Sequence, residues 1–259
     1  MTRIDSTVTG IRPIARDYFH LEFLWPDGAG TPAPGSFVTI RSGGPYDPVL
    51  RRPFAFSSHD PARGRASVIF QLRGRGTAYL ASLKPGDDLD VLGPLGKGFT
   101  APPPGHRPVL VAGGIGLGPM LYLAYSLSTL ARSGACEAPV LALGFRAGSQ
   151  VPDLALPPGT AICTDDGSSG FHGTAAAWLD CFDPGLPPVL YTCGPAPLMA
   201  AVARYAQTRG AACQAAVEQW MACGVGACAG CAVRMKDGSY IKACSDGPVL
   251  DGLAVDWEA

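Results

Sequence analysis

The chain has 259 residues, and its 20 Lys and Arg residues against 21 Asp and Glu residues leave a formal net charge of -1. Only 16% of the residues are charged, so the sequence carries no basic field that would hold nucleic acid or an anionic membrane. A hydrophobic content of 47% argues against disorder, while 34 glycines and 25 prolines predict a folded protein with many turns.

The start of the sequence has no basic region followed by an apolar stretch, so we expect no secretory signal and a cytoplasmic protein. The longest uncharged run, residues 108–131, is interrupted near its middle by four glycines and a proline. This punctuation predicts a strand, a turn and a helix rather than a membrane span.

The first hundred residues predict β-structure. Short apolar runs bounded by glycine or proline predict strands at Tyr18–Leu24, Ser36–Ile40, Ala66–Leu72 and Asp88–Leu92. Short strands at this spacing are typical of a small barrel or sandwich. Thr77 is the expected N-cap of a short helix that runs to Leu83.

After a Pro- and Gly-rich linker at residues 101–108, strands and helices alternate, which predicts a parallel α/β sheet. The expected strands are Val109–Ala112, Val140–Phe145, Ala161–Thr164 and Val189–Thr192, and the expected helices end near Ala131, Leu179 and Thr208. A cysteine-rich tail follows. The sequence therefore predicts three segments: a β-domain at residues 1–100, an α/β domain at 101–212 and a small module at 213–259.

Four of the nine cysteines crowd the tail, as Cys223, Cys228, Cys231 and Cys244. Their C-x4-C-x2-C…C spacing is the plant-type pattern of a [2Fe–2S] site. Glycines between them let the loop wrap closely around a cluster and point amides at its sulfurs. A structural zinc site and plain buried cysteines are the alternatives, although zinc modules usually repeat the C-x2-C pair. The segment contains no histidine, which argues against a Rieske centre.

A glycine-rich turn, residues 113–119, lies between the first strand and the first helix of the α/β domain. Such a turn exposes amides at a helix N-terminus and predicts pyrophosphate binding around Gly114 and Gly116, with an ordinary tight turn as the alternative. It departs from the usual dinucleotide fingerprint, because Pro119 replaces its third glycine. Arg146, not an acidic residue, follows the second strand, which leaves the choice between NAD and NADP open.

Two further motifs carry polar chemistry. The run Arg51–Ser57, together with Gly76 and Thr77, offers an arginine and a helix start to phosphates, although a solvated arginine pair is the alternative. Cys193 ends the last parallel strand, where it would face a ligand crevice or serve as a buried structural cysteine.

In their order along the chain, these motifs resemble the ferredoxin–NADP reductase superfamily over nearly the whole length. Within it the chain is most similar to the electron-transfer subunits of NAD-dependent, type B dihydroorotate dehydrogenases. The matching stretches are Arg51-Arg-Pro53, Thr164-Asp-Asp-Gly167, the tail from Glu218 to Cys228, and Cys244–Val249. The resemblance implies a FAD-binding β-barrel, a parallel α/β nucleotide domain and a small C-terminal [2Fe–2S] module.

The resemblance also implies site residues. FAD would lie on Arg52, Pro53, Phe54, Ala55, Ile69, Phe70, Gln71, Gly76 and Thr77, and NAD(H) on Gly114, Gly116 and Pro119 with Cys193 near the nicotinamide as a catalytic candidate. The four tail cysteines would hold the cluster. One position departs from the superfamily, because Ala55 lacks the usual hydroxyl, and Ser57 is the candidate to replace it.

The implied function is an electron relay in pyrimidine (UMP) biosynthesis. The implied partner is an FMN-containing dihydroorotate dehydrogenase catalytic subunit, in a complex with two copies of each chain, and Trp220 and Met221 are candidates for the contact. Two alternatives remain at this point. The chain could be the diaphorase subunit of a hydrogenase, a sulfide dehydrogenase or a ferredoxin:NAD(P) reductase, or a zinc-stabilised binding protein without enzymatic activity.

Overall fold

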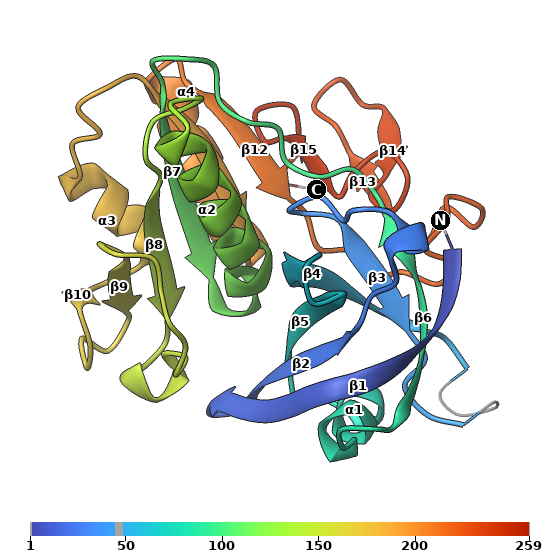
Figure 1. Ribbon diagram of the computed structural model, residues 1–259. Coiled ribbons are helices and arrows are strands. Elements are labelled where there is room, and N and C mark those ends of the chain that lie inside the picture. The colour runs from blue at the N-terminus through green and yellow to red at the C-terminus, as the bar shows by residue number, and fades with distance from the viewer. Residues whose placement is uncertain (1, 45–48, 259) are drawn as a thin grey trace.

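In the computed structural model, which describes residues 2–44 and 49–258, antiparallel strands close into a barrel, confirming the predicted β-domain (Figure 1). Around the barrel the strands follow the order β1 (Thr2–Ala15), β2 (Tyr18–Leu24), β5 (Arg65–Gln71), β4 (Arg52–Asp60), β3 (Phe37–Ile40) and β6 (Asp88–Leu95). Side chains alternate along each strand. On β3, Val38 and Ile40 fill the barrel core, so Phe37 and Thr39 face outward.

Two short helices lie between barrel strands in the sequence: η1 (Asp27–Ala29) follows β2, and α1 (Arg75–Ser82) follows β5. The predicted N-cap at Thr77 is wrong, because Gly74 caps α1 and Thr77 is its third residue. The Thr77 hydroxyl instead accepts hydrogen bonds from the amides of Arg73, at 2.9 Å, and Gly74, at 3.1 Å. It therefore satisfies two donors that precede the helix.

The second sheet has seven strands in the described residues, and all its pairs are parallel except the last. Their order is β10 (Phe171–His172), β9 (Ala161–Thr164), β8 (Val140–Phe145), β7 (Arg107–Gly113), β11 (Pro188–Cys193), β12 (Ala212–Ala216) and β15 (Val249–Asp251). Strands β8 and β9 have the bounds that the sequence predicts. The α/β prediction is confirmed.

Helix α2 (Leu117–Arg132) covers one face of this sheet, and α3 (Ala175–Cys181) and α4 (Ala196–Thr208) cover the other. The single turns η2 (Gly114–Gly116) and η3 (Gly148–Gln150) lie in the connections that follow β7 and β8. The two faces separate along β7, where Leu110 packs with α2 and Val111 packs with α3 and α4. Helix α2 also touches β4, so it lies between the sheet and the barrel (Figure 1).

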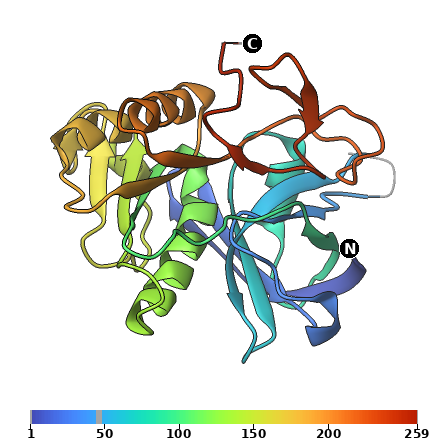
Figure 2. The ribbon, with the colours of Figure 1, turned by 90° about the horizontal axis from the view of Figure 1, so that it is seen from above.

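The C-terminal segment contacts both parts. Its hairpin, β13 (Ala232–Arg234) with β14 (Tyr240–Lys242), forms a separate two-stranded sheet, while β15 returns to pair with β12 (Figure 2). The expected boundary at residues 212 and 213 falls inside β12. Phe37 and Leu95 of the barrel share a core with Cys231 and Cys244. None of the helices in the described part of the chain has the length and apolar character needed to cross a membrane.

Candidate metal centre and nucleotide cleft

The four tail cysteines lie together as two pairs. The Sγ atoms of Cys231 and Cys244 are 3.2 Å apart, and both residues are 2% exposed. Cys223 and Cys228 form the outer pair, in which the Cys228 amide donates to the Cys223 sulfur at 3.4 Å. All four are free thiols. Because each iron of a [2Fe–2S] cluster takes two thiolates, two neighbouring pairs match its ligand set.

Backbone amides surround these sulfurs. The Gly226 amide donates to Cys244 at 3.1 Å, the Val225 amide to Cys223 at 3.4 Å and the Gly230 amide to Cys228 at 3.4 Å. The amides of Val225 and Cys228 lower the pKa of Cys223 to about 6, which favours the thiolate that metals bind. Four cysteines in two pairs, with the C-x4-C-x2-C spacing, are the donor set of a two-iron cluster.

Two glycines of this loop have backbone angles that side chains rarely adopt, with φ of 70° at Gly224 and 81° at Gly226. Gly224 also lies against the barrel. A methyl group added to it would come within 3.1 Å of Thr39 Cγ2 and 3.7 Å of Leu95 Cδ1. The loop that carries Cys223 therefore rests directly on β3 and β6.

Arg52 of β4, Ser42 and Gly76 lie close together at the start of α1. A methyl group on Gly76 would come within 3.3 Å of Arg52 Nε and 2.7 Å of Ser42 Oγ, so only glycine allows this close approach. Ser42 is fully buried, and its hydroxyl has no hydrogen-bond partner within the described residues. An orphaned donor, a guanidinium and the first turn of α1 together match the needs of a pyrophosphate. The sequence signalled Arg52 and Gly76 but not Ser42.

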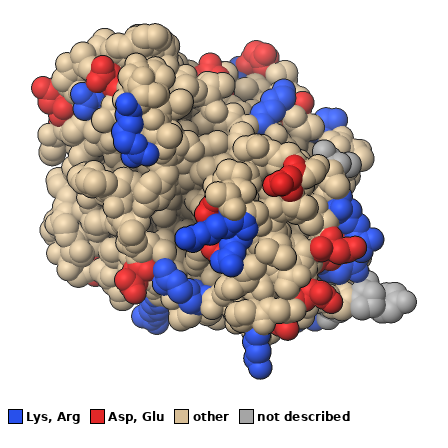
Figure 3. Space-filling view, in the orientation of Figure 1, with Lys and Arg blue, Asp and Glu red and all other residues tan. Residues whose placement is uncertain are grey.

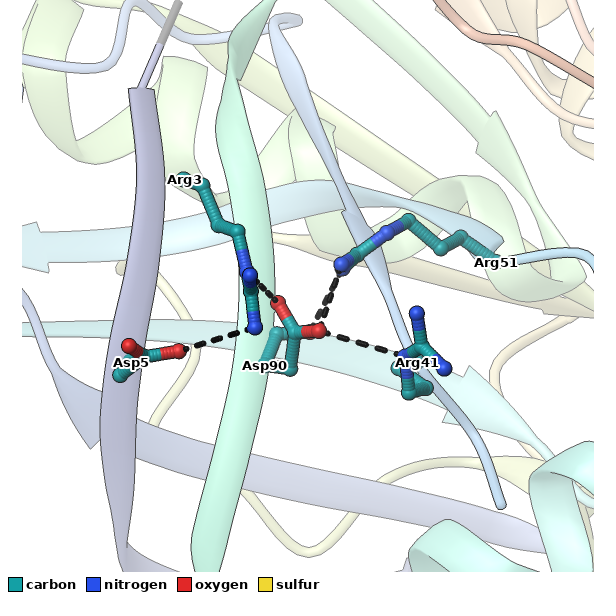
Figure 4. Close-up of polar contacts among 5 residues, drawn as sticks. All are labelled: Arg3, Asp5, Arg41, Arg51 and Asp90. Carbon is teal, nitrogen blue, oxygen red and sulfur yellow. Dashed lines mark hydrogen bonds and ion pairs between the residues drawn. The ribbon is translucent and has the colours of Figure 1, made fainter. Parts of the chain in front are cut away.

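Arg51 has a different role from Arg52. Its guanidinium contacts Asp90 on β6, with 2.6 Å between Nη2 and Oδ2, and donates to the Asp90 carbonyl at 2.9 Å (Figure 4). Arg3 and Arg41 reach the same carboxylate, each at 3.2 Å. Burial alone would raise the pKa of Asp90, but hydrogen bonds and charge from Arg51 and Arg3 lower it overall. The pair therefore anchors the start of β4 and positions Arg52.

Replacing Asp90 with Asn is expected to destabilise the fold by about 1–3 kcal/mol, because three guanidinium groups lose a charged acceptor. Since the folded pKa is depressed, the contribution of Asp90 is present above its ordinary pKa and is lost as pH falls through the folded value. Urea unfolding at pH 7 and pH 3 checks this, with a smaller gap between the two proteins expected at pH 3. An equal gap at both values would contradict it.

The hydroxyl missing at Ala55 is not replaced by Ser57. Ser57 is 6% exposed, and its hydroxyl is 2.8 Å from that of Ser67. Helix α2 covers it, because a methyl group on Gly118 would lie 3.6 Å from the Cβ atoms of Ser57 and Ile69. Gln71 also lies outside the barrel core and lines the cleft described next, where its Oε1 accepts from Arg73 at 2.8 Å.

A cleft of about 810 Å³ opens between the barrel and the carboxyl ends of the parallel strands (Figure 3). Tyr18, Gln71 and Arg73 line its barrel side, while Gly113, Gly114, Phe145, Arg146, Asp165, Pro195 and Glu218 line its sheet side. This is where open α/β sheets bind their ligands. Its walls join the barrel face that carries Gln71 to the glycine turn before α2.

Of the residues predicted for NAD(H), Gly114 lines the cleft, whereas Gly116 and Pro119 are buried beneath it. A methyl group on Gly116 would collide with the Cys193 carbonyl oxygen, so the turn packs tightly on the end of β11. Burial, and then the charge of Glu218, raise the pKa of Cys193 to about 12. The thiol is therefore neutral near pH 7, and its catalytic role stays a prediction.

Asp165 is a cleft residue that the sequence analysis named only as part of the stretch Thr164–Gly167, without a role. The turn after β9 is rigid, because Asp166 accepts from Ser168, whose hydroxyl in turn accepts from the Gly148 amide at 2.7 Å. Asp165, next to it, lines the cleft beside Arg146, and no described group donates to its carboxylate. A carboxylate in this cleft can accept a hydrogen bond from a ribose hydroxyl, although Asp165 follows the third strand and not the second, where dinucleotide-binding domains usually carry their acidic residue.

Comparison with known proteins agrees with this geometry. Residues 218–256 match the model of the iron-sulfur cluster binding domain of dihydroorotate dehydrogenase B. The electron transfer subunit of dihydroorotate dehydrogenase B (NAD(+)) from Desulforamulus reducens is 34% identical, over 98% of each chain. The subunit of the same name from Bacillus caldolyticus is 40% identical, over 84% of each. The chain belongs to this family.

Solved structures agree with the assignment to dihydroorotate dehydrogenase B electron transfer subunits. An NADH-dependent reduced ferredoxin-NADP oxidoreductase superposes with a TM-score of 0.82 at 25% identity, over 98% of this chain and 91% of that one. Phthalate dioxygenase reductase shares the fold, with a TM-score of 0.63 at 18% identity, over 93% and 94%. Family membership rules out the zinc-stabilised binding protein and favours the dehydrogenase subunit over the other diaphorases.

The two residues expected at a partner contact differ in exposure. Trp220 is 91% exposed. Met221, in contrast, is partly buried and packs against the core that contains Cys231 and Cys244. Of these two residues, only Trp220 presents its apolar side chain to solvent.

Proposed function

We propose that this chain passes electrons between an FMN-containing dihydroorotate dehydrogenase catalytic subunit and NAD+ in pyrimidine (UMP) biosynthesis. The proposal includes FAD on residues 1–100, NAD(H) on 101–212, a [2Fe–2S] cluster on 213–259, two copies of each subunit and a cytoplasmic location. One observation carries it. The loop that begins at Cys223 packs on Thr39 of β3, and Thr39 pairs directly with Pro53 of β4. The loop that carries the cluster ligands therefore lies on the strand next to β4, the strand that we assign to the flavin.

The residues divide into three tasks. The FAD pyrophosphate would bind to Arg52, Ser42 and the first turn of α1, which Thr77 shapes. The strands along the flavin would be formed by Pro53, Phe54, Ala55, Ile69, Phe70 and Gln71. Gly114 would bind NAD(H) in the cleft, supported by Gly116 and Pro119, and Cys193 would underlie the nicotinamide end. Cys223, Cys228, Cys231 and Cys244 would hold the cluster.

The division of labour follows from the chemistry of the bound groups. A flavin exchanges hydride with a nicotinamide and single electrons with an iron–sulfur cluster. The chain's own part is to hold these groups close together and to keep water from the cysteine pair that is 2% exposed. Trp220, at 91% exposure, is our candidate for the contact with the catalytic subunit.

Anaerobic affinity purification of this chain from its native cells, followed by an assay for dihydroorotate-dependent NAD+ reduction, tests the proposal. Activity together with FMN, FAD, iron and acid-labile sulfide in the complex is the expected result. A preparation that reduces a dye with NADH but does not oxidise dihydroorotate would contradict the proposed partner. Zinc without iron or sulfide would contradict the proposed cluster.

Asp165 is expected to select NADH. Its carboxylate would accept a hydrogen bond from the adenosine 2′-hydroxyl and repel a 2′-phosphate at the same place. Replacing Asp165 with Asn should lower kcat/KM for NADH about tenfold, the loss of about 1.4 kcal/mol, and should narrow the gap to NADPH. Steady-state dye reduction with both nucleotides measures this. Asp180→Asn, on the exposed face of α3, is the matched control, and an unchanged NADH preference in Asp165→Asn would refute the role.

A further inference from the structure

Thr39 carries an unexplained polar group in the wall between the barrel and the cysteine loop. The residue is 3% exposed, and its Oγ1 has no hydrogen-bond partner within the described residues. Buried hydroxyls without a partner are rare in folded proteins, because losing water without compensation is unfavourable. A partner for this hydroxyl is therefore expected among the groups that the protein binds at this wall.

The position of Thr39 limits which group that is. Its neighbours Val38 and Ile40 point into the barrel core, so the Thr39 side chain is on the outer face with Phe37, which packs in one core with Cys231 and Cys244. From outside, Gly224 covers it, with 3.1 Å between Thr39 Cγ2 and the position of an added methyl group. Thr39 thus faces the loop segment that follows Cys223 directly.

In this loop, the groups that donate hydrogen bonds to cysteine sulfurs are backbone amides. The amides of Val225 and Cys228 donate to Cys223, and those of Gly226 and Gly230 donate to Cys244 and Cys228. Hydrogen bonds to cluster sulfurs stabilise the reduced form, which carries one more negative charge, and so raise the reduction potential. A side-chain hydroxyl under the loop would add to this set from the barrel side.

We propose that the Thr39 hydroxyl, which has none of the four cysteine sulfurs as a partner, donates a hydrogen bond to an inorganic sulfur of the cluster and raises its reduction potential. This inference rests on the proposed function, since it requires the cluster to be held by the four cysteines. It assigns Thr39 as a tuning residue that belongs to the barrel rather than to the cysteine module. The barrel strand that neighbours the flavin strand would thereby set the potential of the next electron carrier.

The test is a redox titration of the cluster by electron paramagnetic resonance in the purified holo-complex. Thr39→Val keeps the shape of the side chain and removes the donor. It should shift the equilibrium toward the oxidised cluster about tenfold, which lowers the midpoint potential by about 59 mV for one electron. Thr39→Ser should restore the wild-type value. Thr192→Val is the matched control, because Thr192 is also a fully buried threonine with an unpartnered hydroxyl, but it lies on β11 in the other sheet.

The outcomes separate the inference from the proposed function. A wild-type cluster potential in Thr39→Val would overturn the inference. A shift in the FAD potential alone would also overturn it, because the hydroxyl would then hydrogen-bond to the flavin. A wild-type complex without iron and acid-labile sulfide would overturn the proposed function instead. If Thr39→Val does not assemble a cluster, Thr39→Ala replaces it. In addition, pulsed resonance of the wild type in D2O should reveal one more exchangeable proton near the reduced cluster than in Thr39→Ala.

Discussion

Replacing Cys228 with Ala is expected to abolish dihydroorotate-dependent NAD+ reduction while leaving NADH-dependent dye reduction in place. Cys228 pairs with Cys223, and one iron of the cluster would be left with a single thiolate. Losing a direct ligand should lower cluster binding by more than the roughly 10–100-fold loss of metal affinity that follows removal of a group hydrogen-bonded to a ligand. The flavin and nucleotide residues belong to other elements, so the hydride branch should remain active.

Iron and acid-labile sulfide per chain, measured beside the two activities, check this expectation. Cys181→Ala is the control, because Cys181 is an exposed free cysteine at the end of α3, in the α/β domain. It should keep both activities and full iron content. Unchanged iron and unchanged dihydroorotate oxidation in Cys228→Ala would show that this cysteine is not a ligand.

Replacing Arg52 with Ala is expected to release FAD. The Arg52 Nε atom faces the space beside Gly76, where a phosphate would accept charge-assisted hydrogen bonds. Losing one such bond costs about 1.5–3 kcal/mol, so the Kd for FAD should rise by roughly tenfold to a hundredfold. Both the NADH-dye activity and the dihydroorotate activity should fall with flavin occupancy, unlike in Cys228→Ala.

Fluorescence titration of the apoprotein with FAD measures the change. Arg63→Ala serves as the control. Arg63 is an exposed arginine in the turn between β4 and β5, and it pairs with Asp60, the last residue of β4. Added FAD should restore the activity of Arg52→Ala, because the flavin strands themselves are intact. Wild-type affinity in Arg52→Ala would contradict the phosphate assignment and leave Ser42 and α1 without their predicted role.

The two adjacent arginines illustrate what sequence reasoning could and could not resolve. The motif predicted a phosphate contact, with a solvated pair as the alternative, and Arg51, whose side chain is 20% exposed and bound to Asp90, fits neither interpretation. Arg51 is anchored to Asp90, which is 39 residues away in sequence, while Arg52 faces Gly76. No local pattern distinguishes these two side chains, because their environments come from β6 and α1.

The sequence by itself determined four of the six described barrel strands but not β1, the alternation of strands and helices in the α/β domain, the glycine turn before α2 and the cysteine spacing of the cluster loop. These features are local, since side-chain periodicity, backbone freedom and ligand spacing act within a few residues. Only the tertiary structure decided that Cys231 pairs with Cys244, that β15 rejoins the sheet and that Ser57 is buried. It also decided that Ser42 and Thr39 are buried without a partner in the described residues and that Asp165 lines the cleft. Those decisions depend on which distant surfaces pack together, and burial of this kind has no signature in the neighbouring residues of the chain.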